Sequence, residues 1–357
     1  MPRGRKKKIV EQIPINKSSE DKQKQSNTLV ELTMEELLKS TDDKKKVLDT
    51  LMRVINKQHG KGIMTTADDP KLKIKCIPTG IRTLDALLTR ENQETGLPMG
   101  RTIELYGPEH SGKSTIALRF IAQAQKYGFM CAYLDSENAY DETWAIKQGV
   151  NTQLLQYSRL EKDDPESIEK DPEKIKKMPM TSGEVLQLVR TLVKSTIFKI
   201  VIVDSVASLV PRKELEGNIE DNQMALLARE MSKGMRCLTA ENKTQGTIII
   251  FINQLRSNIG VMYGNPNVTP GGRALKFFAS LRMNVRSGES WPNKKEAEAK
   301  EVIVKLDKDK IFGKWEQDER FFLFRDGHID FREDLKKKMK GTDDDPTPVP
   351  ADESGIF

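Results

Sequence analysis

The stretch of this sequence best suited to chemistry is a nine-residue run. It consists of Gly107, Pro108, Glu109, His110, Ser111, Gly112, Lys113, Ser114 and Thr115, and it matches the phosphate-binding pattern G-x-x-x-x-G-K-[ST]. The glycines let the backbone wrap around phosphates, and the N–H groups at the start of the following helix face the anion. The Lys113 ammonium suits β- and γ-phosphates, and the Ser114 hydroxyl suits Mg²⁺. The run therefore predicts a P-loop that binds a nucleotide with Mg²⁺.

Acidic and amide side chains follow three further apolar runs. Because the carboxyl ends of parallel strands meet at the edge of a sheet where ligands bind, we expect these side chains to lie near the P-loop. Asp204 has the position of a metal-orienting aspartate. A carboxylate at Asp135 or Glu137 suits a base that deprotonates an attacking water, and the amide of Gln254 suits a sensor of the γ-phosphate. Each acid alone is more often a solvated strand end, but the P-loop favours the functional interpretation.

The elements that position these residues alternate between strand-like and helical patterns. Strands are predicted at Thr102–Tyr106, Met130–Leu134, Phe198–Val203, Thr247–Ile252 and Leu281–Val285, and helices at Ser114–Tyr127 and Asn222–Thr239. This alternation predicts an α/β fold with a mostly parallel β-sheet flanked by helices. A separate amphipathic helix is predicted over 45–57, with Gly60 placed to end it. Since a lone helix of this length is unstable in water, it must pack on its own domain or on another subunit.

Composition excludes several classes of protein. The 357 residues include 59 Lys+Arg and 53 Asp+Glu, which gives a net charge of +6. No apolar run approaches the length of a membrane span, which is about 18 residues. The basic N-terminus lacks a following apolar segment, so we expect no secretory signal. Cys76, Cys131 and Cys237 lack the spacing of a zinc site or a disulfide framework, and we interpret them as buried free thiols. Membrane, secreted and zinc-finger classes are therefore excluded.

Longer ordered runs make the chain resemble the RecA family of recombinases over about residues 47–322. These runs are LDSE at 134–137, VDSVA at 203–207, FINQLR at 251–256, IGVMYGNP at 259–266 and GGRALKF at 271–277. The resemblance implies a RecA-like P-loop ATPase core and a DNA-dependent ATPase that uses ATP and Mg²⁺. It also implies a helical homo-polymer on single-stranded DNA that pairs with homologous duplex DNA and exchanges strands in recombination and DNA repair. The implied location is the cytoplasm of a bacterium or of a phage-infected host, with loader or single-strand-binding proteins as possible partners.

The resemblance also implies roles for individual residues. In the active site it assigns phosphate binding to Lys113, Mg²⁺ binding to Ser114 and Asp204, base catalysis to Glu137, γ-phosphate sensing to Gln254, and adenine contact to Asp141 and Trp144. At subunit contacts it implies that Lys308 and Lys310 reach the neighbour's ATP and that Phe277 packs in the interface. DNA contacts fall on Arg229, Ser232, Arg236, Arg256, Gly271 and Gly272, beside two loops at 214–223 and 256–272. Without the resemblance, Trp144 would be interpreted as a core residue, and the arginines of the 222–239 helix and the lysine pair as solvated cations.

The predicted domain organisation follows from the resemblance and from shifts in composition. It comprises a disordered polar and basic tail at 1–44, an N-terminal helical oligomerisation element and linker at 45–77, the ATPase core at 78–322 with an inserted connection at 158–183, a reduced C-terminal module at 323–340, and an acidic disordered tail at 341–357. The insertion is longer than the bacterial pattern. In the family's second, duplex-holding DNA site, Arg286 and Lys305 remain, but Ser287 and Ile303 stand where cations are expected.

Two alternative functions remain open at this level. A hexameric ring DNA helicase uses the same ATPase core, but it would be expected to carry an arginine finger and a helicase-loading domain, which the sequence lacks. A scaffold that coats DNA and uses ATP only for assembly is the second alternative. The intact Lys113, Glu137 and Asp204 argue against that scaffold, and electron microscopy of the protein on single-stranded DNA would separate filaments from rings.

Overall fold

The computed structural model describes residues 41–60, 62–89, 94–170, 174–217, 225–257, 267–314 and 316–339. The described residues up to Leu72 form one unit, and those from Lys73 onward form a second. Among these residues, no helix is both long enough and apolar enough to cross a membrane.

The first unit contains helix α2, Thr41–His59, and a short turn of 3₁₀-helix, η3, Pro70–Leu72. The predicted helix is therefore present, but it begins inside the segment predicted to be a disordered tail, whose residues 1–40 lie outside the described residues. The helix thus includes four residues, 41–44, that the composition assigns to the tail. Gly60 ends the helix with φ +99°, and its N–H donates to the Asn56 carbonyl oxygen at 3.0 Å.

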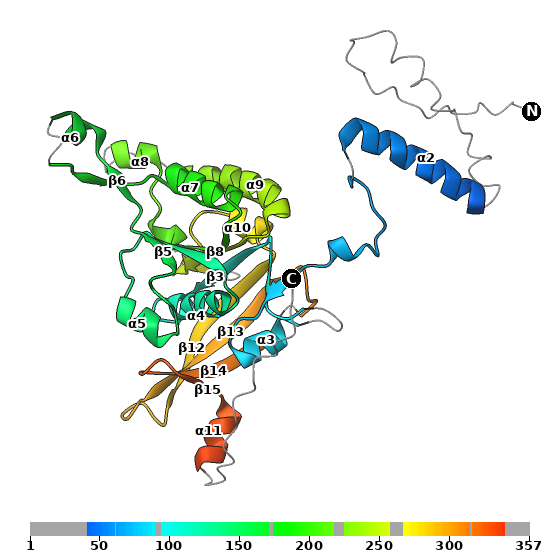
Figure 1. Ribbon diagram of the computed structural model, residues 1–357. Helices are drawn as coiled ribbons and strands as arrows, with labels where there is room; N and C mark the ends of the chain where they lie inside the picture. The colour runs from blue at the N-terminus through cyan, green and yellow to red at the C-terminus, as the bar shows by residue number, and fades with distance from the viewer. Residues whose placement is uncertain are drawn as a thin grey trace, which may run out of the picture. The chain divides into compact units, whose positions relative to one another are not determined.

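The second unit is built on a nine-stranded sheet (Figure 1). In spatial order its strands are β15 (Ile329–Asp330), β14 (Asp318–Phe324), β13 (Ala299–Asp309), β12 (Leu281–Trp291), β3 (Thr102–Gly107), β9 (Ile248–Gln254), β8 (Phe198–Asp204), β4 (Met130–Asp135) and β5 (Leu155–Ser158). The five pairings from β12 to β5 are parallel, and the three from β15 to β12 are antiparallel. The mostly parallel α/β fold and all five predicted strands are confirmed.

Helices cover both faces of this sheet because its central strands are apolar on both faces. On one face, alternate residues such as Ile200 and Ile250 pack against helix α4 (Lys113–Lys126). On the other face, Val201 and Phe251 pack against α7 (Ser182–Lys194), α9 (Leu226–Gln245) and α10 (Ala274–Phe278). The two layers are visible above and below the sheet in Figure 1. The fold thus buries the strands and leaves only their ends for chemistry.

Shorter elements complete the second unit. They are α3 (Arg82–Leu87), α5 (Glu142–Lys147), η4 (Val206–Ser208), α8 (Arg212–Glu216) and α11 (Arg332–Met339), with the antiparallel pairs β1 (Cys76–Ile77) with β2 (Leu97–Pro98) and β10 (Arg256–Ser257) with β11 (Asn267–Val268). The predicted insertion contains α6 (Pro165–Lys170) and a third pair, β6 (Glu161–Asp163) with β7 (Lys177–Pro179).

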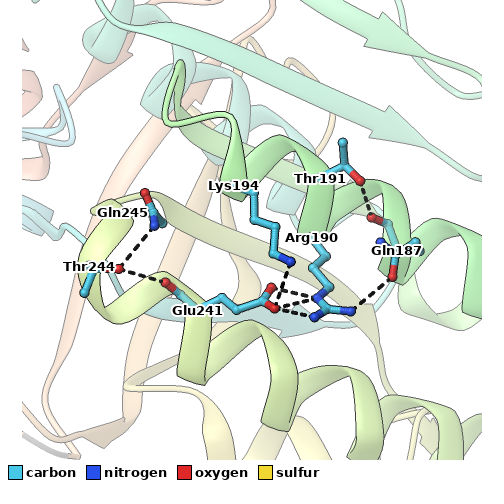
Figure 2. Close-up of polar contacts among 7 residues, drawn as sticks. All are labelled: Gln187, Arg190, Thr191, Lys194, Glu241, Thr244 and Gln245. Carbon is cyan, nitrogen blue, oxygen red and sulfur yellow. Dashed lines mark hydrogen bonds and ion pairs between the residues drawn. The ribbon is translucent and has the colours of Figure 1, made fainter. Parts of the chain in front are cut away.

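An ion-pair cluster joins helices α7 and α9 (Figure 2). The Glu241 carboxylate accepts hydrogen bonds from Arg190 Nε at 2.7 and 2.8 Å, and Lys194 Nζ lies 3.2 Å from it. The Arg190 hydrogen bonds lower the pKa of Glu241 to about 2, with Lys194 adding to the effect. Since α9 carries three of the predicted DNA-contact residues, this cluster fixes the helix that presents them.

Two features differ from the sequence-based expectations. The predicted boundary between core and C-terminal module falls inside β14, and β15 extends the same sheet beyond it. The run at 318–324 was not predicted as a strand because its first three residues are charged. Among the thiols, all free, only Cys131 is fully buried. Cys76 and Cys237 are half-buried, because Cys76 lies on a two-stranded edge ribbon and Cys237 on a helix covered from one side only.

Candidate active site

The P-loop connects the end of β3 to the start of α4 and lines a cavity of about 560 Å³. We call this the P-loop cavity; its lining comprises Glu109, His110, Ser111, Gly112, Lys113, Ser114, Thr115, Glu137, Ala139, Asp204, Ser205, Ile252, Gln254 and Leu323. Two glycines are required by its geometry. Gly112 adopts φ +97°, and a Cβ on Gly107 would meet the Val285 carbonyl oxygen at 2.0 Å. Seven of the nine motif residues, 109–115, therefore share one cavity with the three predicted strand-end residues Glu137, Asp204 and Gln254.

Lys113 is held at the mouth of the loop. Its Nζ donates to the carbonyl oxygens of Gly107 at 3.2 Å and Pro108 at 2.6 Å. Burial lowers the pKa of Lys113, and the charges of Asp204, Glu137 and Glu109 partly oppose that shift. The Lys113 ammonium is thus a positive charge in a partly desolvated environment, where it attracts anions more strongly than it would in water.

Asp204 and Ser114 form an oxygen-rich corner of the cavity. Asp204 Oδ2 accepts hydrogen bonds from Ser114 Oγ at 2.7 Å and from the Tyr133 hydroxyl at 2.5 Å. Burial raises the pKa of Asp204 despite these two hydrogen bonds. A hydroxyl and a carboxylate side by side are hard oxygen ligands of the kind that Mg²⁺ prefers. The residue type of Tyr133 does not indicate this contact, because a tyrosine within an apolar strand is usually a core residue.

Glu137 is the acid that faces the cavity from the turn after β4. Its Oε1 accepts a hydrogen bond from Gln254 Nε2 at 3.0 Å and another from Ser205 Oγ. The neighbouring Asp135 is only 1% exposed and accepts hydrogen bonds from the backbone N–H groups of Glu137 and Tyr140, each at 3.0 Å. Asp135 therefore shapes the turn, and Glu137 is left as the carboxylate able to take a proton. The residue type of Ser205 does not indicate its contact with Glu137 either, although the sequence places it directly after Asp204.

Asp141 and Trp144 lie beside the P-loop and do not line its cavity. Asp141 Oδ1 accepts the Trp144 backbone N–H at 3.0 Å and caps helix α5. The Trp144 indole Nε1 donates to Thr115 Oγ1 at 3.0 Å, and its half-buried ring packs against the core. The contact of Trp144 with the last P-loop residue is compatible with a nearby base-binding position.

Comparison with known proteins identifies the family. The RecA N-terminal domain family matches residues 46–328. Protein RecA of Cutibacterium acnes is 41% identical over 289 residues, which cover 81% of this chain and 76% of that protein. Protein RecA of Colwellia psychrerythraea is 40% identical over 287 residues, which cover 80% of this chain and 76% of that protein. Protein RecA of Frankia casuarinae is 42% identical over 270 residues, which cover 75% of this chain and 72% of that protein. The chain belongs to the RecA family. Its role is that of a recombinase in DNA recombination and repair, and no comparison favours the ring helicase.

The residues that the RecA resemblance assigns to subunit contacts lie together, away from the P-loop cavity. Lys308 Nζ donates to the backbone carbonyl oxygens of Lys276 and, at 3.0 Å, Phe277, and Lys310 Nζ donates to the same Phe277 oxygen at 3.1 Å. Burial and the nearby charge of Lys310 lower the pKa of Lys308 to about 8. The Phe277 residue is 64% exposed. An exposed aromatic residue whose backbone carbonyl oxygen accepts hydrogen bonds from two lysines forms a surface suited to contact another chain.

Five of the six residues assigned to DNA in this RecA-family chain lie on helix α9 or against it. Gly271 and Gly272 adopt φ +82° and +71°, and a Cβ on Gly272 would meet Ala228 Cβ at 2.6 Å, so this turn packs directly against the helix. Arg229, Ser232 and Arg236 lie along α9, although the Ser232 hydroxyl donates to the Ala228 carbonyl oxygen of its own helix. Arg256 begins β10 and pairs with Val268. Residues 218–223 and 258–266 of the two predicted loops lie outside the described residues.

Proposed function

We propose that this RecA-family chain hydrolyses ATP in the P-loop cavity and couples hydrolysis to a helical filament on single-stranded DNA. The observation that carries the proposal is the hydrogen bond from Gln254 to Glu137. It joins the proposed base to the end of β9, and Arg256, a proposed DNA-contact residue, follows two positions later. Hydrolysis and DNA binding are thereby linked through two residues of backbone.

The P-loop cavity suits Mg²⁺ and ATP on the chemistry of its side chains. Ser114 Oγ and Asp204 would hold the metal, Lys113 would bind the phosphates, and Trp144 with Asp141 would lie beside the adenine. Mg²⁺ bound there would neutralise the charge that develops on the β- and γ-phosphates. Glu137 accepts a proton from the attacking water, while Ser205 and Gln254 keep its carboxylate in place.

Assembly would complete the active site in this proposal. Lys308 and Lys310 would reach the ATP bound by an adjacent copy, where cations stabilise the charge on the transferred phosphoryl group. Phe277, whose carbonyl oxygen both lysines contact, would pack against that copy. Arg229, Arg236 and Arg256, with the Gly271–Gly272 amides, would bind DNA phosphates. We further propose a cytoplasmic location, where DNA is accessible, and loading proteins as possible partners.

The test replaces the proposed base. We expect Glu137→Gln to retain binding of ATP and single-stranded DNA but to lose about 10²- to 10⁴-fold in DNA-stimulated turnover, as expected for removal of a general base. Glu142→Gln is the matched control, because Glu142 is an exposed acid five positions along that does not line the cavity. Unchanged turnover in Glu137→Gln would remove Glu137 as the base. Closed rings on DNA, seen by electron microscopy with a slowly hydrolysed ATP analogue, would favour the helicase instead.

A further inference from the structure

A fully buried carboxylate lies on β3, three residues before the P-loop. Glu104 is 0% exposed, although acids are almost never fully buried without partners. Arg282 Nε on β12 donates to its Oε2 at 2.5 Å, and Asn253 Nδ2 on β9 donates to its Oε1 at 3.0 Å. The proposed hydrolysis uses none of these three side chains, so their cost of burial calls for another explanation.

The Asn253 side chain joins three segments. Besides Glu104, its Nδ2 donates to the Pro270 carbonyl oxygen at 3.1 Å, and its Oδ1 accepts the backbone N–H of Gln254 at 3.0 Å. Both amide hydrogens are therefore used, which fixes the orientation of the side chain. Pro270 precedes the Gly271–Gly272 turn that packs on α9, and Gln254 holds Glu137. The buried Asn253 amide thus connects Pro270, at the C-terminal end of the second loop, to Gln254, which donates a hydrogen bond to the proposed base.

The same network continues toward the lysine pair. Arg282 stacks over the Tyr106 ring, with the guanidinium carbon 4.3 Å from the ring centroid, and the Tyr106 hydroxyl donates to Asp307. Arg282 also lies directly opposite Lys308 in the β12–β13 register. A continuous series of contacts therefore runs from Pro270 in the second loop through Asn253, Glu104 and Arg282 to the strand position opposite Arg282, which is Lys308.

We infer that Glu104 and Asn253 are positioning residues that transmit DNA binding at the second loop to the Gln254–Glu137 pair. Glu104 is well suited to this role, because its charge strengthens the hydrogen bond that orients the Asn253 amide in a low-dielectric interior. If Pro270 moves when DNA binds, Asn253 must either move with it or break a buried hydrogen bond. The inference rests on the proposed function, since it assumes that DNA stimulates ATP hydrolysis.

The test compares two buried asparagines in the full-length chain. Asn242 is 1% exposed, and its side chain makes hydrogen bonds to the Thr247 backbone at 2.6 and 3.0 Å, far from the network. We expect Asn253→Ala to reduce the ratio of poly(dT)-stimulated to DNA-free ATP hydrolysis by about tenfold or more, and Asn242→Ala to leave it within about twofold. Both variants should melt at lower temperature than the unmodified protein. A retained ratio in Asn253→Ala, or an equal loss in both variants, would overturn the inference.

Hydrogen exchange on the unmodified protein provides a test that needs neither variant to fold nor DNA to stimulate hydrolysis. We expect a non-hydrolysable ATP analogue, added without DNA, to slow exchange of the Gly271, Gly272 and Arg273 amides through Gln254 and Asn253. Unchanged exchange there, with slowed exchange at the P-loop, would refute the inference while leaving nucleotide binding intact. If instead DNA does not stimulate hydrolysis by the unmodified protein, the proposed function fails, and the exchange result alone decides the inference.

Discussion

Removing the Ser205 hydroxyl tests whether the orientation of Glu137, and not only its presence, sets the hydrolysis rate. Ser205 is 1% exposed and its Oγ donates to Glu137 Oε1, the same oxygen that accepts from Gln254. A hydrogen bond to a charged group contributes about 1.5–3 kcal/mol. If all of it is lost in the transition state, kcat falls by about 10- to 150-fold. Because Gln254 continues to hold the carboxylate, we expect Ser205→Ala to lie at the lower end, about 10- to 30-fold.

The assay is steady-state ATP hydrolysis at saturating single-stranded DNA, with Ser208→Ala as the matched control. Ser208 Oγ lies in the same turn, 2.6 Å from Ser136 Oγ and 3.0 Å from the Ser205 carbonyl oxygen, and makes no hydrogen bond to Glu137. We expect Ser208→Ala to keep kcat within about threefold. An unchanged kcat in Ser205→Ala, or a loss carried only by KM, would show that this hydroxyl does not orient the base.

Three further predictions use the cited pKa shifts. Because burial raises the pKa of Asp204, folding favours its protonated form, and the ionised form reduces the stability of the fold as the pH rises above 3.8. We therefore expect Asp204→Asn to melt about 2–4 °C higher than the unmodified protein at pH 8 by scanning fluorimetry, yet to gain no stability from Mg²⁺–ATP analogues. A lower melting temperature for Asp204→Asn would contradict this. The pKa of Lys308, lowered to about 8, predicts that DNA-stimulated hydrolysis falls between pH 7 and 9 as the lysine loses its charge. Lys308→Arg, which stays charged over this range, should keep its rate. Parallel pH profiles of the unmodified protein and Lys308→Arg would argue against a role for the charge. The pKa of Glu241 is lowered to about 2 by Arg190, so the stability it contributes is complete above about pH 4.5 and is lost toward pH 2, and the urea midpoints of Glu241→Gln and the unmodified protein should differ at pH 7 and converge as the pH falls.

The sequence alone predicted five of the six strands in the parallel part of the sheet because each of the five begins as a short apolar run. The sixth, β5, was not predicted, since its sequence LQYS is half polar and partly exposed. Ile248–Gln254 and Phe198–Asp204 are buried on both faces, so no polar alternation obscures them. The antiparallel extension was harder to predict because Asp318–Phe324 begins with charged residues and lies near the sheet edge. Its strand character comes from pairing with β13, a contact between segments that the local pattern does not reveal.

The sequence indicates the proposed catalytic residues more completely than the residues that hold them. Glu137, Asp204 and Gln254 stand at strand ends, and strand ends can be located from a sequence. The roles of Tyr133 and Ser205 depend on hydrogen bonds between neighbouring strands, which require the strand order and register. Their residue types carried no signal, since a tyrosine in a strand and a serine in a turn are ordinary.

The position of the proposed base suits a hydrolysis rate that depends on DNA binding better than a high rate that is independent of DNA. Glu137 accepts a hydrogen bond from the Gln254 amide, and the position of Gln254 depends on Asn253 and on the backbone that leads to Arg256, the proposed DNA-contact residue. A displacement of Arg256 must therefore alter the Gln254–Glu137 hydrogen bond unless Leu255, the one residue between Arg256 and Gln254, absorbs it. β9 is buried up to Asn253 and is paired with β8 up to Ile252 and with β3 up to Gln254, so the strand leaves little room for movement. If Arg256 contacts DNA as proposed, a base held in this way would respond to that contact, which is the arrangement that DNA-dependent hydrolysis requires.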